Sequence, residues 1–404
     1  MNQPLLTHKR RGGFSLIELM VVIAIVLVMS LAIFGVMSTS EGKKRSLTSV
    51  NDINQSGNFA LFQLEKALRN AGSGFSQSYA QSFGCKLFAY QKQAAPGNTG
   101  VVLPFPGTMA LPFDTLNAAV GGTYVLAPMI IASGATKPGM SGKASDALIV
   151  MVGAAGYGEV PTAFTNVATS TQLNLQSTLS FKPNDFVLVA DEAGSAGSLP
   201  CMIEQVDSGF TAGSNTTALP LAGSYYASSI KDTGGAIRNL IDFTNNALAM
   251  GIGNPAGNPP SFQMFGVGDN NVLFQYDLLQ GSTYDTPIPI ADGVFEMHAL
   301  YGVDTNNDGL VDTWVDPSAA GYDYATLESG TVAANNTLLT IKAIRLGLIM
   351  RTSLPEKAAV TTGPLVLFSD LGKTFTRTLA TAEQNYRYRI IESTIPLRNS
   401  LLLN

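Results

Sequence analysis

Histidine, cysteine, tryptophan and charged residues are all scarce in this chain of 404 residues. It holds two histidines, two cysteines and one tryptophan, and only 13% of its residues are charged. His8 lies in the basic N-terminal segment, which leaves His298 as the single histidine of the remaining chain and excludes a zinc site built on two histidines. The net charge of −5 provides no excess of Lys and Arg, so a nucleic-acid-binding surface is not expected.

Proline is absent between Pro4 and Pro96, and no cluster of turn residues appears before Asn70. Apolar residues from Leu47 to Leu68 recur at helical spacing. This pattern predicts one long helix over 14–71. Its first half, 14–37, is apolar and long enough to span a bilayer, and its second half, 38–71, is amphipathic.

The junction before this helix has an unusual order of residues. A basic segment, 9–13, ends in two glycines, and it is followed by Phe14 and by Glu18 within an otherwise apolar run. A carboxylate in a membrane-spanning segment is costly and is functional by default. In an ordinary secretory signal the cleavage site follows the apolar stretch, whereas here the small residues precede it. Cleavage after Gly13 would remove a leader, 1–13, and give Phe14 a free amine that Glu18 of a neighbouring subunit could pair with.

This junction resembles the class III signal of type IV prepilins. The resemblance implies cleavage by a prepilin peptidase between Gly13 and Phe14, N-methylation of Phe14, and a role for Glu18 in assembly. The alternative is a plain single-pass anchor with a chance glutamate. The basic leader predicts a cytoplasmic N-terminus, an inner-membrane span and a periplasmic globular domain.

The globular segment, 72–404, consists of short β-branched runs separated by Gly, Pro, Asn and Ser clusters. Long loops are expected over 117–143 and 211–236. The predicted fold is α+β and pilin-like: a long N-terminal helix packed on an antiparallel β-sheet with large loop insertions. Seven strands are predicted, at 147–152, 185–190, 202–206, 272–276, 293–301, 338–350 and 386–394.

Several stretches also resemble the PilW-type minor pilins, namely 56–72, 145–150, 184–191, 290–304 and 388–399. The resemblance implies a minor pilin that initiates pilus assembly and joins the filament tip complex, supporting adhesion and twitching motility. Implied partners are other minor pilins, the major pilin and a PilY-type tip adhesin. The alternative is a J-type pseudopilin of type II secretion, whose globular part is usually much smaller.

A single loop carries a metal-binding pattern. Oxygen-bearing side chains alternate from Asp304 and are followed by Gly309, as in the first nine positions of an EF-hand calcium loop. The twelfth position is Val315 rather than Glu, so the ligand set is incomplete, and the alternative is a solvated turn. The predicted Ca²⁺ ligands are the side chains of Asp304, Asn306, Asp308 and Asp312 and the carbonyl of Leu310. No organic cofactor is expected.

The two cysteines, Cys85 and Cys201, both lie on the translocated side of the anchor. An oxidising compartment makes a disulfide the expected state, and two unpaired buried thiols are the alternative.

An enzymatic function is not predicted, because catalysis by a histidine would have to rest on His298. On an alternating strand, Phe295, Met297 and Ala299 are expected to face one way. Glu296 and His298 are expected to face the other, on the more polar face. An ordinary strand residue is therefore favoured over a catalytic base.

Overall fold

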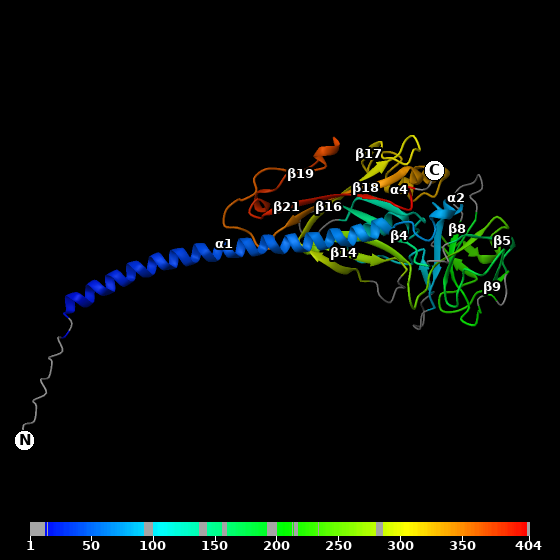
Figure 1. Ribbon diagram of the computed structural model, residues 1–404, viewed down its shortest axis with the longest axis horizontal. Helices are drawn as coiled ribbons and strands as arrows, with labels where there is room; N and C mark the ends of the chain where they lie inside the picture. Colours follow the sequence, from blue (N-terminus) through cyan, green and yellow to red (C-terminus); the bar gives the residue numbers. More distant parts are fainter. Residues whose placement is uncertain are drawn as a thin grey trace, which may run out of the picture. The chain divides into compact units, whose positions relative to one another are not determined.

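The computed structural model describes residues 13, 15–92, 100–136, 144–155, 160–191, 200–211, 213, 217–232, 234–279 and 286–401 (Figure 1). Residues 1–12 of the predicted leader, and the predicted cleavage-site residue Phe14, lie outside this set. The chain divides into two compact units, Met1–Asp52 and Ile53–Asn404.

The first unit is helical from Leu16 onward. Helix α1 (Leu16–Asn70) is continuous over 55 residues, which confirms the predicted helix. The backbone N–H groups of Glu18 and Leu19 donate to the carbonyl of Ser15 at 3.0 and 3.1 Å, so Ser15 begins the helix. Within the part of the chain that the structure describes, α1 is the one helix long and apolar enough to cross a membrane.

The second part of α1 belongs to the globular unit. Its buried residues are spaced three or four positions apart and form one face. Gly57 allows this face to approach two strands, β18 (Ile341–Arg351) and β21 (Tyr388–Pro396). A Cβ at Gly57 would lie 2.5 Å from Ile391 Cδ1 and 3.0 Å from Met350 Cγ. The buried residues are Ile53, Gly57, Ala60, Leu64 and Leu68.

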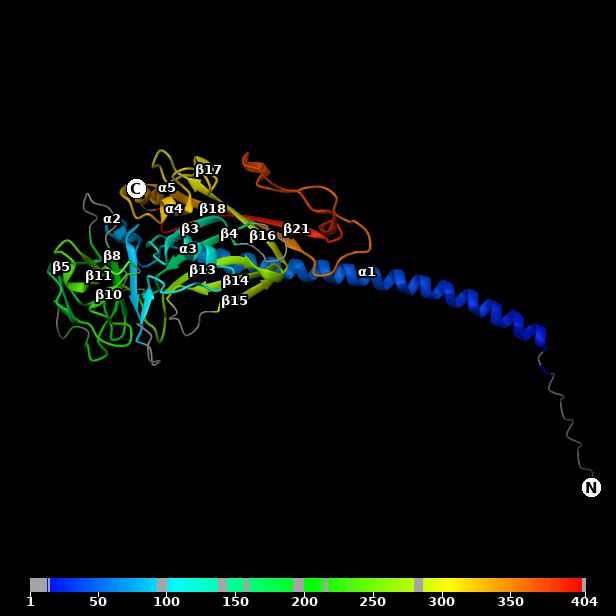
Figure 2. The same cartoon turned by 180° about the vertical axis from the view of Figure 1, so that it is seen from behind.

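Three sheets account for most of the globular unit (Figures 1 and 2). The four-stranded sheet has the order β17-β16-β18-β21, and the five-stranded sheet has the order β15-β14-β13-β4-β3. These two sheets are built from β3 (Met129–Thr136), β4 (Ser145–Val152), β13 (Ser261–Gly268), β14 (Val272–Asp277), β15 (Ile288–Asp292), β16 (Val294–Val303), β17 (Thr313–Val315), β18 and β21.

The eight-stranded sheet has the order β2-β1-β8-β7-β12-β5-β6-β9 and its own apolar core, which includes Phe164, Val189 and Met202. Its strands are β1 (Lys86–Tyr90), β2 (Val101–Leu103), β5 (Thr162–Asn166), β6 (Gln172–Leu175), β7 (Phe186–Ala190), β8 (Pro200–Gln205), β9 (Ala218–Pro220) and β12 (Leu248–Gly253). Two small hairpins are formed by β10 (Ser229–Lys231) with β11 (Ile237–Asn239), and by β19 (Leu365–Leu367) with β20 (Phe375–Arg377).

Short helices connect the strands. The α-helices are α2 (Tyr79–Ser82), α3 (Asp114–Val120), α4 (Tyr324–Leu327) and α5 (Val332–Thr340). The 3-10 helices are η1 (Ser76–Ser78), η3 (Leu240–Asp242), η4 (Asp269–Asn271), η6 (Ser369–Leu371) and η7 (Thr381–Glu383).

The predicted α+β class, with a long helix and antiparallel sheets, is confirmed, but several details were wrong, among them the predicted loop 211–236, which contains β9 and β10. The strands form several sheets rather than one, and β1 pairs with β8 in parallel. The segment 117–143, predicted as a loop, contains the end of α3 and all of β3. The strand predicted from Leu338 begins at Ile341, because Thr331 caps α5 and the helix continues to Thr340.

Candidate functional site

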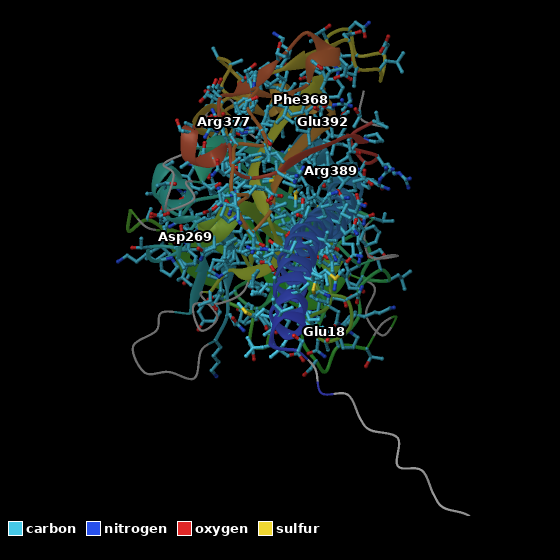
Figure 3. The ribbon with its side chains drawn as sticks, turned by 90° about the vertical axis from the view of Figure 1, so that its left-hand side faces the viewer. Glu18, Asp269, Phe368, Arg377, Arg389 and Glu392 are labelled. Atoms are coloured by element: carbon cyan, nitrogen blue, oxygen red, sulfur yellow. A yellow bond between two sulfur atoms is a disulfide. The ribbon has the colours of Figure 1, made fainter. Side chains whose placement is uncertain are left out.

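The structure describes the residues on either side of Phe14 at the predicted processing site. Gly13 and Ser15 are exposed, and Glu18 lies in the first turn of α1 (Figure 3), where the helix dipole favours a carboxylate. The Glu18 side chain is exposed and therefore open to a group on another chain. Cleavage and methylation at Gly13–Phe14, and the assembly role of Glu18, stay predictions.

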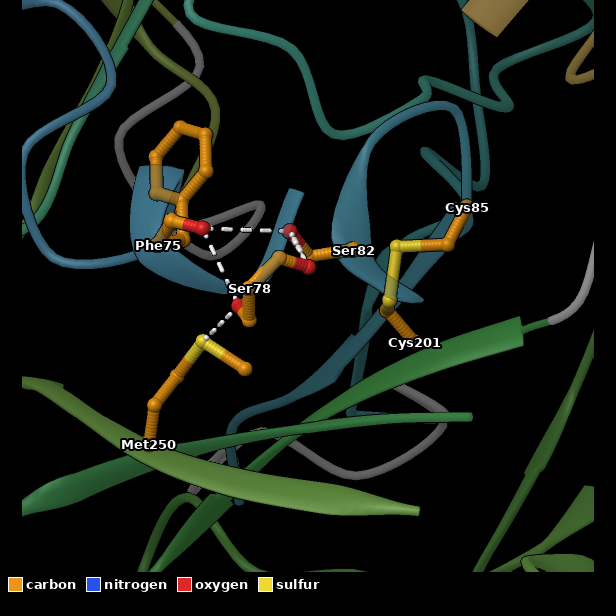
Figure 4. Close-up of a disulfide and its surroundings, with 6 residues drawn as sticks. All are labelled: Phe75, Ser78, Ser82, Cys85, Cys201 and Met250. Atoms are coloured by element: carbon orange, nitrogen blue, oxygen red, sulfur yellow. Dashed lines mark hydrogen bonds between the residues drawn. A yellow bond between two sulfur atoms is a disulfide. The ribbon is translucent and has the colours of Figure 1, made fainter. Parts of the chain in front are cut away.

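The two cysteines are joined, which confirms the predicted disulfide. Cys85 precedes β1 and Cys201 lies on β8, and their Cα atoms are 5.6 Å apart. The bond reinforces the parallel pairing of these two strands, in which Leu87 lies opposite Cys201. Hydrogen-bonded serines lie beside it (Figure 4): Ser78 Oγ lies 3.0 Å from both the Phe75 carbonyl and Met250 Sδ, and Ser82 Oγ donates to the Ser78 carbonyl at 2.9 Å.

The loop that follows β16 closes around the carboxylate of Asp304, which is fully buried. Asp304 Oδ1 accepts from the backbone N–H groups of Asn306, Asn307 and Asp308 at 3.2, 2.7 and 3.3 Å. Asp304 Oδ2 accepts from the Gly309 N–H at 2.8 Å. Asn307 and Gly309 have φ values of 61° and 83°, a conformation that Asn and Gly tolerate best.

The remaining carboxylates of this loop also accept hydrogen bonds. Asp312 Oδ2 accepts from the hydroxyl and the N–H of Thr305 at 2.7 and 2.8 Å, which lowers the pKa of Asp312. Asp308 Oδ1 accepts from the Leu310 N–H at 2.8 Å. Among the described residues, which include the whole loop, no group of three or more His, Cys, Asp or Glu is placed to hold a metal. Calcium binding here therefore stays a prediction.

A cluster of charged side chains lies under the β19–β20 hairpin, around His298 on β16. The Nδ1 atom of His298 is 3.6 Å from Asp146 Oδ2 on β4, and the Nε2 atom is 3.4 Å from Glu296 Oε2. Burial opposes the charged ring, but the hydrogen bonds and charges of Asp146 and Glu296 outweigh it and raise the pKa of His298 to about 9. The ring is therefore an imidazolium at neutral pH.

Two more contacts connect this cluster to the hairpin. Arg377 on β20 donates to Glu296 Oε1 at 2.7 Å and to Glu383 Oε2 at 3.1 Å. The Phe375 ring stacks on His298 with ring centroids 3.7 Å apart. Because both nitrogens of His298 face carboxylates, neither is free to take a proton from a nucleophile. The arrangement can anchor a hairpin, and it does not present a catalytic base.

A cavity of about 530 Å³ opens beside His298. Phe368 lines it in a left-handed backbone conformation, with φ 60°, which a bulky residue adopts only at a cost of about 1–3 kcal/mol. Glu392 Oε1 holds this conformation by accepting from the Phe368 N–H at 3.1 Å, and the two residues lie close together in Figure 3. Other lining residues are Asp146, Leu300, Asp316, Lys373 and Phe375.

Sequence reasoning placed Glu296 and His298 together on the more polar face of the strand, and the structure surrounds both with charged side chains, but their burial was not expected. Both residues are buried, and Phe295, expected on the opposite face, packs in one apolar cluster with Leu300. The pairing of β16 with β18 shifts register between Val294 and Glu296, which changes the direction of Phe295.

The partners Asp146 and Arg377 were missed. They come from strands far away in the sequence, and no local pattern indicates that these strands lie beside β16.

The long apolar helix and the disulfide-bonded sheets define a class: a β-rich protein with an N-terminal helix that is long and apolar enough to cross a membrane. Residues 8–38 match the prokaryotic N-terminal methylation motif, and residues 261–399 match the type IV pilus-assembly protein W family, PilW. These matches confirm the predicted resemblance and support a type IV pilus minor pilin-like protein. No curated protein and no solved structure matches the chain.

The PilW match covers β13 to β21, and therefore the Asp304 loop and His298. The eight-stranded sheet lies entirely outside both matches.

Proposed function

We propose that this protein is a minor pilin that takes part in the initiation of type IV pilus assembly and in the filament tip complex, supporting adhesion and twitching motility. One observation carries the proposal: a prepilin methylation motif on the apolar helix and a PilW segment in the globular unit occur in one chain. The role is structural rather than enzymatic, and the charge cluster at His298 serves the fold.

Assembly would proceed through the exposed apolar half of α1. A prepilin peptidase cuts after Gly13, and the new amine of Phe14 pairs with Glu18 of a neighbouring subunit, which satisfies two groups that are costly alone in hydrocarbon. The protein waits in the inner membrane with its globular domain in the periplasm. It then joins other minor pilins, the major pilin and a PilY-type adhesin at the filament tip.

The test uses two variants of the full chain as the only copy in the cell. Gly13→Leu is expected to block cleavage, seen as a heavier protein that stays in the membrane. Glu18→Ala is expected to be cleaved normally but to be lost from filaments sheared from the surface. Normal piliation with either variant would refute the proposal.

A J-type pseudopilin of type II secretion is the alternative function. Deletion of the gene distinguishes the two, because a pilus subunit is required for surface filaments and twitching, whereas a pseudopilin is required for export of secreted proteins. Loss of secretion with normal twitching would favour the alternative.

A calcium site at Asp304–Asp312 is a second proposal for the same protein. The support is the spacing of the oxygen-bearing side chains. A bound ion would have to replace the backbone N–H groups that now donate hydrogen bonds to these oxygens. An incomplete ligand set predicts a dissociation constant on the order of 0.1–1 mM. Calorimetric titration of the full chain in detergent tests this, and heats equal to those of Asp308→Ala/Asp312→Ala would reject it.

A further inference from the structure

Two segments depart from regular backbone geometry around the cavity beside His298. In β3, the three residues 133–135 lie opposite a single residue of β4, Asp146, so the strand bulges there. On another wall, Phe368 has a φ of 60°, which is strained for a bulky residue. Bulges are frequent next to active sites, and strained residues persist where a ligand is held. The meeting of both departures at one cavity indicates a binding site.

The position and size of the cavity suit a small ligand. It lies between β3 and β4 of the five-stranded sheet, β16 of the four-stranded sheet, the segment after β17 and the β19–β20 hairpin. Its volume of about 530 Å³ falls within the range of about 300–1,000 Å³ that small-molecule sites occupy. Sites of this kind commonly form where separate parts of a fold meet.

The charged groups of the inner wall already have partners. His298 lies 3.6 Å from Asp146 and 3.4 Å from Glu296. Asp146 also accepts hydrogen bonds from the backbone N–H groups of Gly134 and Ala299 at 2.9 and 3.0 Å. This wall is therefore fixed in place, and its charges compensate one another rather than a ligand.

Two other charged residues line the cavity, and the fold does not pair them. Asp316 follows β17 and Lys373 lies between β19 and β20, and both are exposed. Asp316 Oδ1 accepts from the N–H and the hydroxyl of Ser318 at 2.7 and 2.6 Å. Within the described part of the chain, neither Asp316 nor Lys373 is paired with the other or with any further charged group. A ligand that carries one positive and one negative charge would satisfy both residues, whereas a singly charged ligand would satisfy only one.

The cavity also offers apolar surface. Leu300, Phe368 and Phe375 line it. The Phe375 ring stacks on His298 with ring centroids 3.7 Å apart, so the ring is held in place without a ligand. A wall that is already ordered loses little conformational freedom on binding, and an apolar side chain placed against it would leave water.

We propose that this cavity binds a short peptide with free ends, its amine beside Asp316, its carboxylate beside Lys373 and an apolar side chain against Phe375. The volume exceeds what a single amino acid fills, which favours a peptide of a few residues. This inference goes beyond the proposed function and does not depend on pilus assembly.

The test is calorimetric titration of the purified full chain in detergent with the tripeptide Ala-Phe-Ala. We expect saturable binding of the peptide with free ends, weakened roughly three- to tenfold by acetylation of its amine or by amidation of its carboxylate. Lys373→Gln should weaken binding of the free peptide by a similar factor but bind the amidated peptide as tightly as the wild type does. Asp316→Asn should behave in the same way toward the acetylated peptide, because each variant removes the partner of one end only.

The matched control is Lys357→Gln, an exposed lysine that does not line the cavity and should bind like the wild type. All three substitutions are at exposed positions, and thermal unfolding of each variant verifies that its fold is intact. The inference is wrong if the free tripeptide shows no saturable binding at millimolar concentration, if free and capped peptides bind equally, or if Lys357→Gln loses as much affinity as Lys373→Gln. Binding to the purified chain requires no filament, so such a failure would leave the proposed function standing.

Discussion

At the scale of single residues, His298 couples the fold to pH. Its pKa is raised from about 6.5 to about 9, so its contribution to stability is fully present below pH 6.5 and is lost as the pH rises through 9. A pKa shift of this size means that the folded protein stabilises the charged ring over the neutral ring by on the order of 3 kcal/mol. We expect the free energy of unfolding of the full chain in detergent to fall between pH 6.5 and 9.5, measured with urea.

The matched variant is His298→Gln, which keeps a hydrogen-bonding side chain but cannot titrate. It is expected to be less stable than the wild type at pH 6.5 and to lose less stability over the same interval. Burial also raises the pKa of Glu296 and raises the pKa of Glu328 to about 8, so the comparison with His298→Gln is what isolates the contribution of His298. Identical pH profiles for the two proteins would show that His298 is not the group responsible.

Asp304 is expected to stabilise its loop without any metal. Asp304→Ala removes the acceptor of four backbone N–H groups, three on Oδ1 and one on Oδ2. Buried donors left without an acceptor lower the free energy of unfolding by about 1–3 kcal/mol. We therefore expect Asp304→Ala to lower it by about 2 kcal/mol, measured with a chelator present so that no metal contributes. Asp308→Ala, at an exposed position, is the control and should cost far less. Equal losses, or none, would contradict this role of Asp304.

At the scale of elements, Gly57 is expected to be required for the packing of α1. Alanine normally favours a helix over glycine by about 1 kcal/mol. At Gly57 the added methyl would meet Ile391 Cδ1 at 2.5 Å, whereas at Gly42 nothing lies within 4 Å. Gly57→Ala should therefore lower the thermal midpoint of the full chain, and Gly42→Ala should leave it unchanged or raise it. A Gly57→Ala protein as stable as Gly42→Ala would mean that the helix can shift without cost.

The elements that could be predicted from sequence are those whose signal is local. The helix was predictable because proline is absent and apolar residues repeat at helical spacing. Strands β4, β7 and β14 were predictable because they are short runs rich in β-branched, aromatic and other apolar residues between turn residues. The start of β18 was not, because the residues just before Ile341 suit a strand as well as a helix, and the N-cap at Thr331 is what places them in α5. The sheet partners were also inaccessible, since the pairing of β16 with β18 and the position of Asp146 beside His298 depend on contacts between distant segments.

At the scale of the whole molecule, the disulfide is expected to stabilise one part of the globular unit more than the other. It links the start of β1 to β8 in the eight-stranded sheet, whereas the four- and five-stranded sheets contain no cysteine. One face of the eight-stranded sheet has its own apolar core, and the two cysteines pack in the main core on its other face. In the chain-entropy model, a cross-link between residues as far apart in the sequence as Cys85 and Cys201 raises the free energy of unfolding by about 4–5 kcal/mol. Opening it should therefore weaken the eight-stranded sheet first, because regions of a protein can open separately.

The variant is Cys85→Ala/Cys201→Ala, compared with the oxidised wild type as full chains in detergent by hydrogen exchange. We expect faster exchange in β1, β7, β8 and β12, with little change in β16, β18 and β21. The wild type should have no alkylatable thiol until it is reduced, since Cys85 and Cys201 are its only cysteines. Faster exchange that extends equally into β16 and β18 would mean that the globular unit opens as one cooperative body. The eight-stranded sheet would then not be the separable part that its own core and its position outside the PilW match indicate.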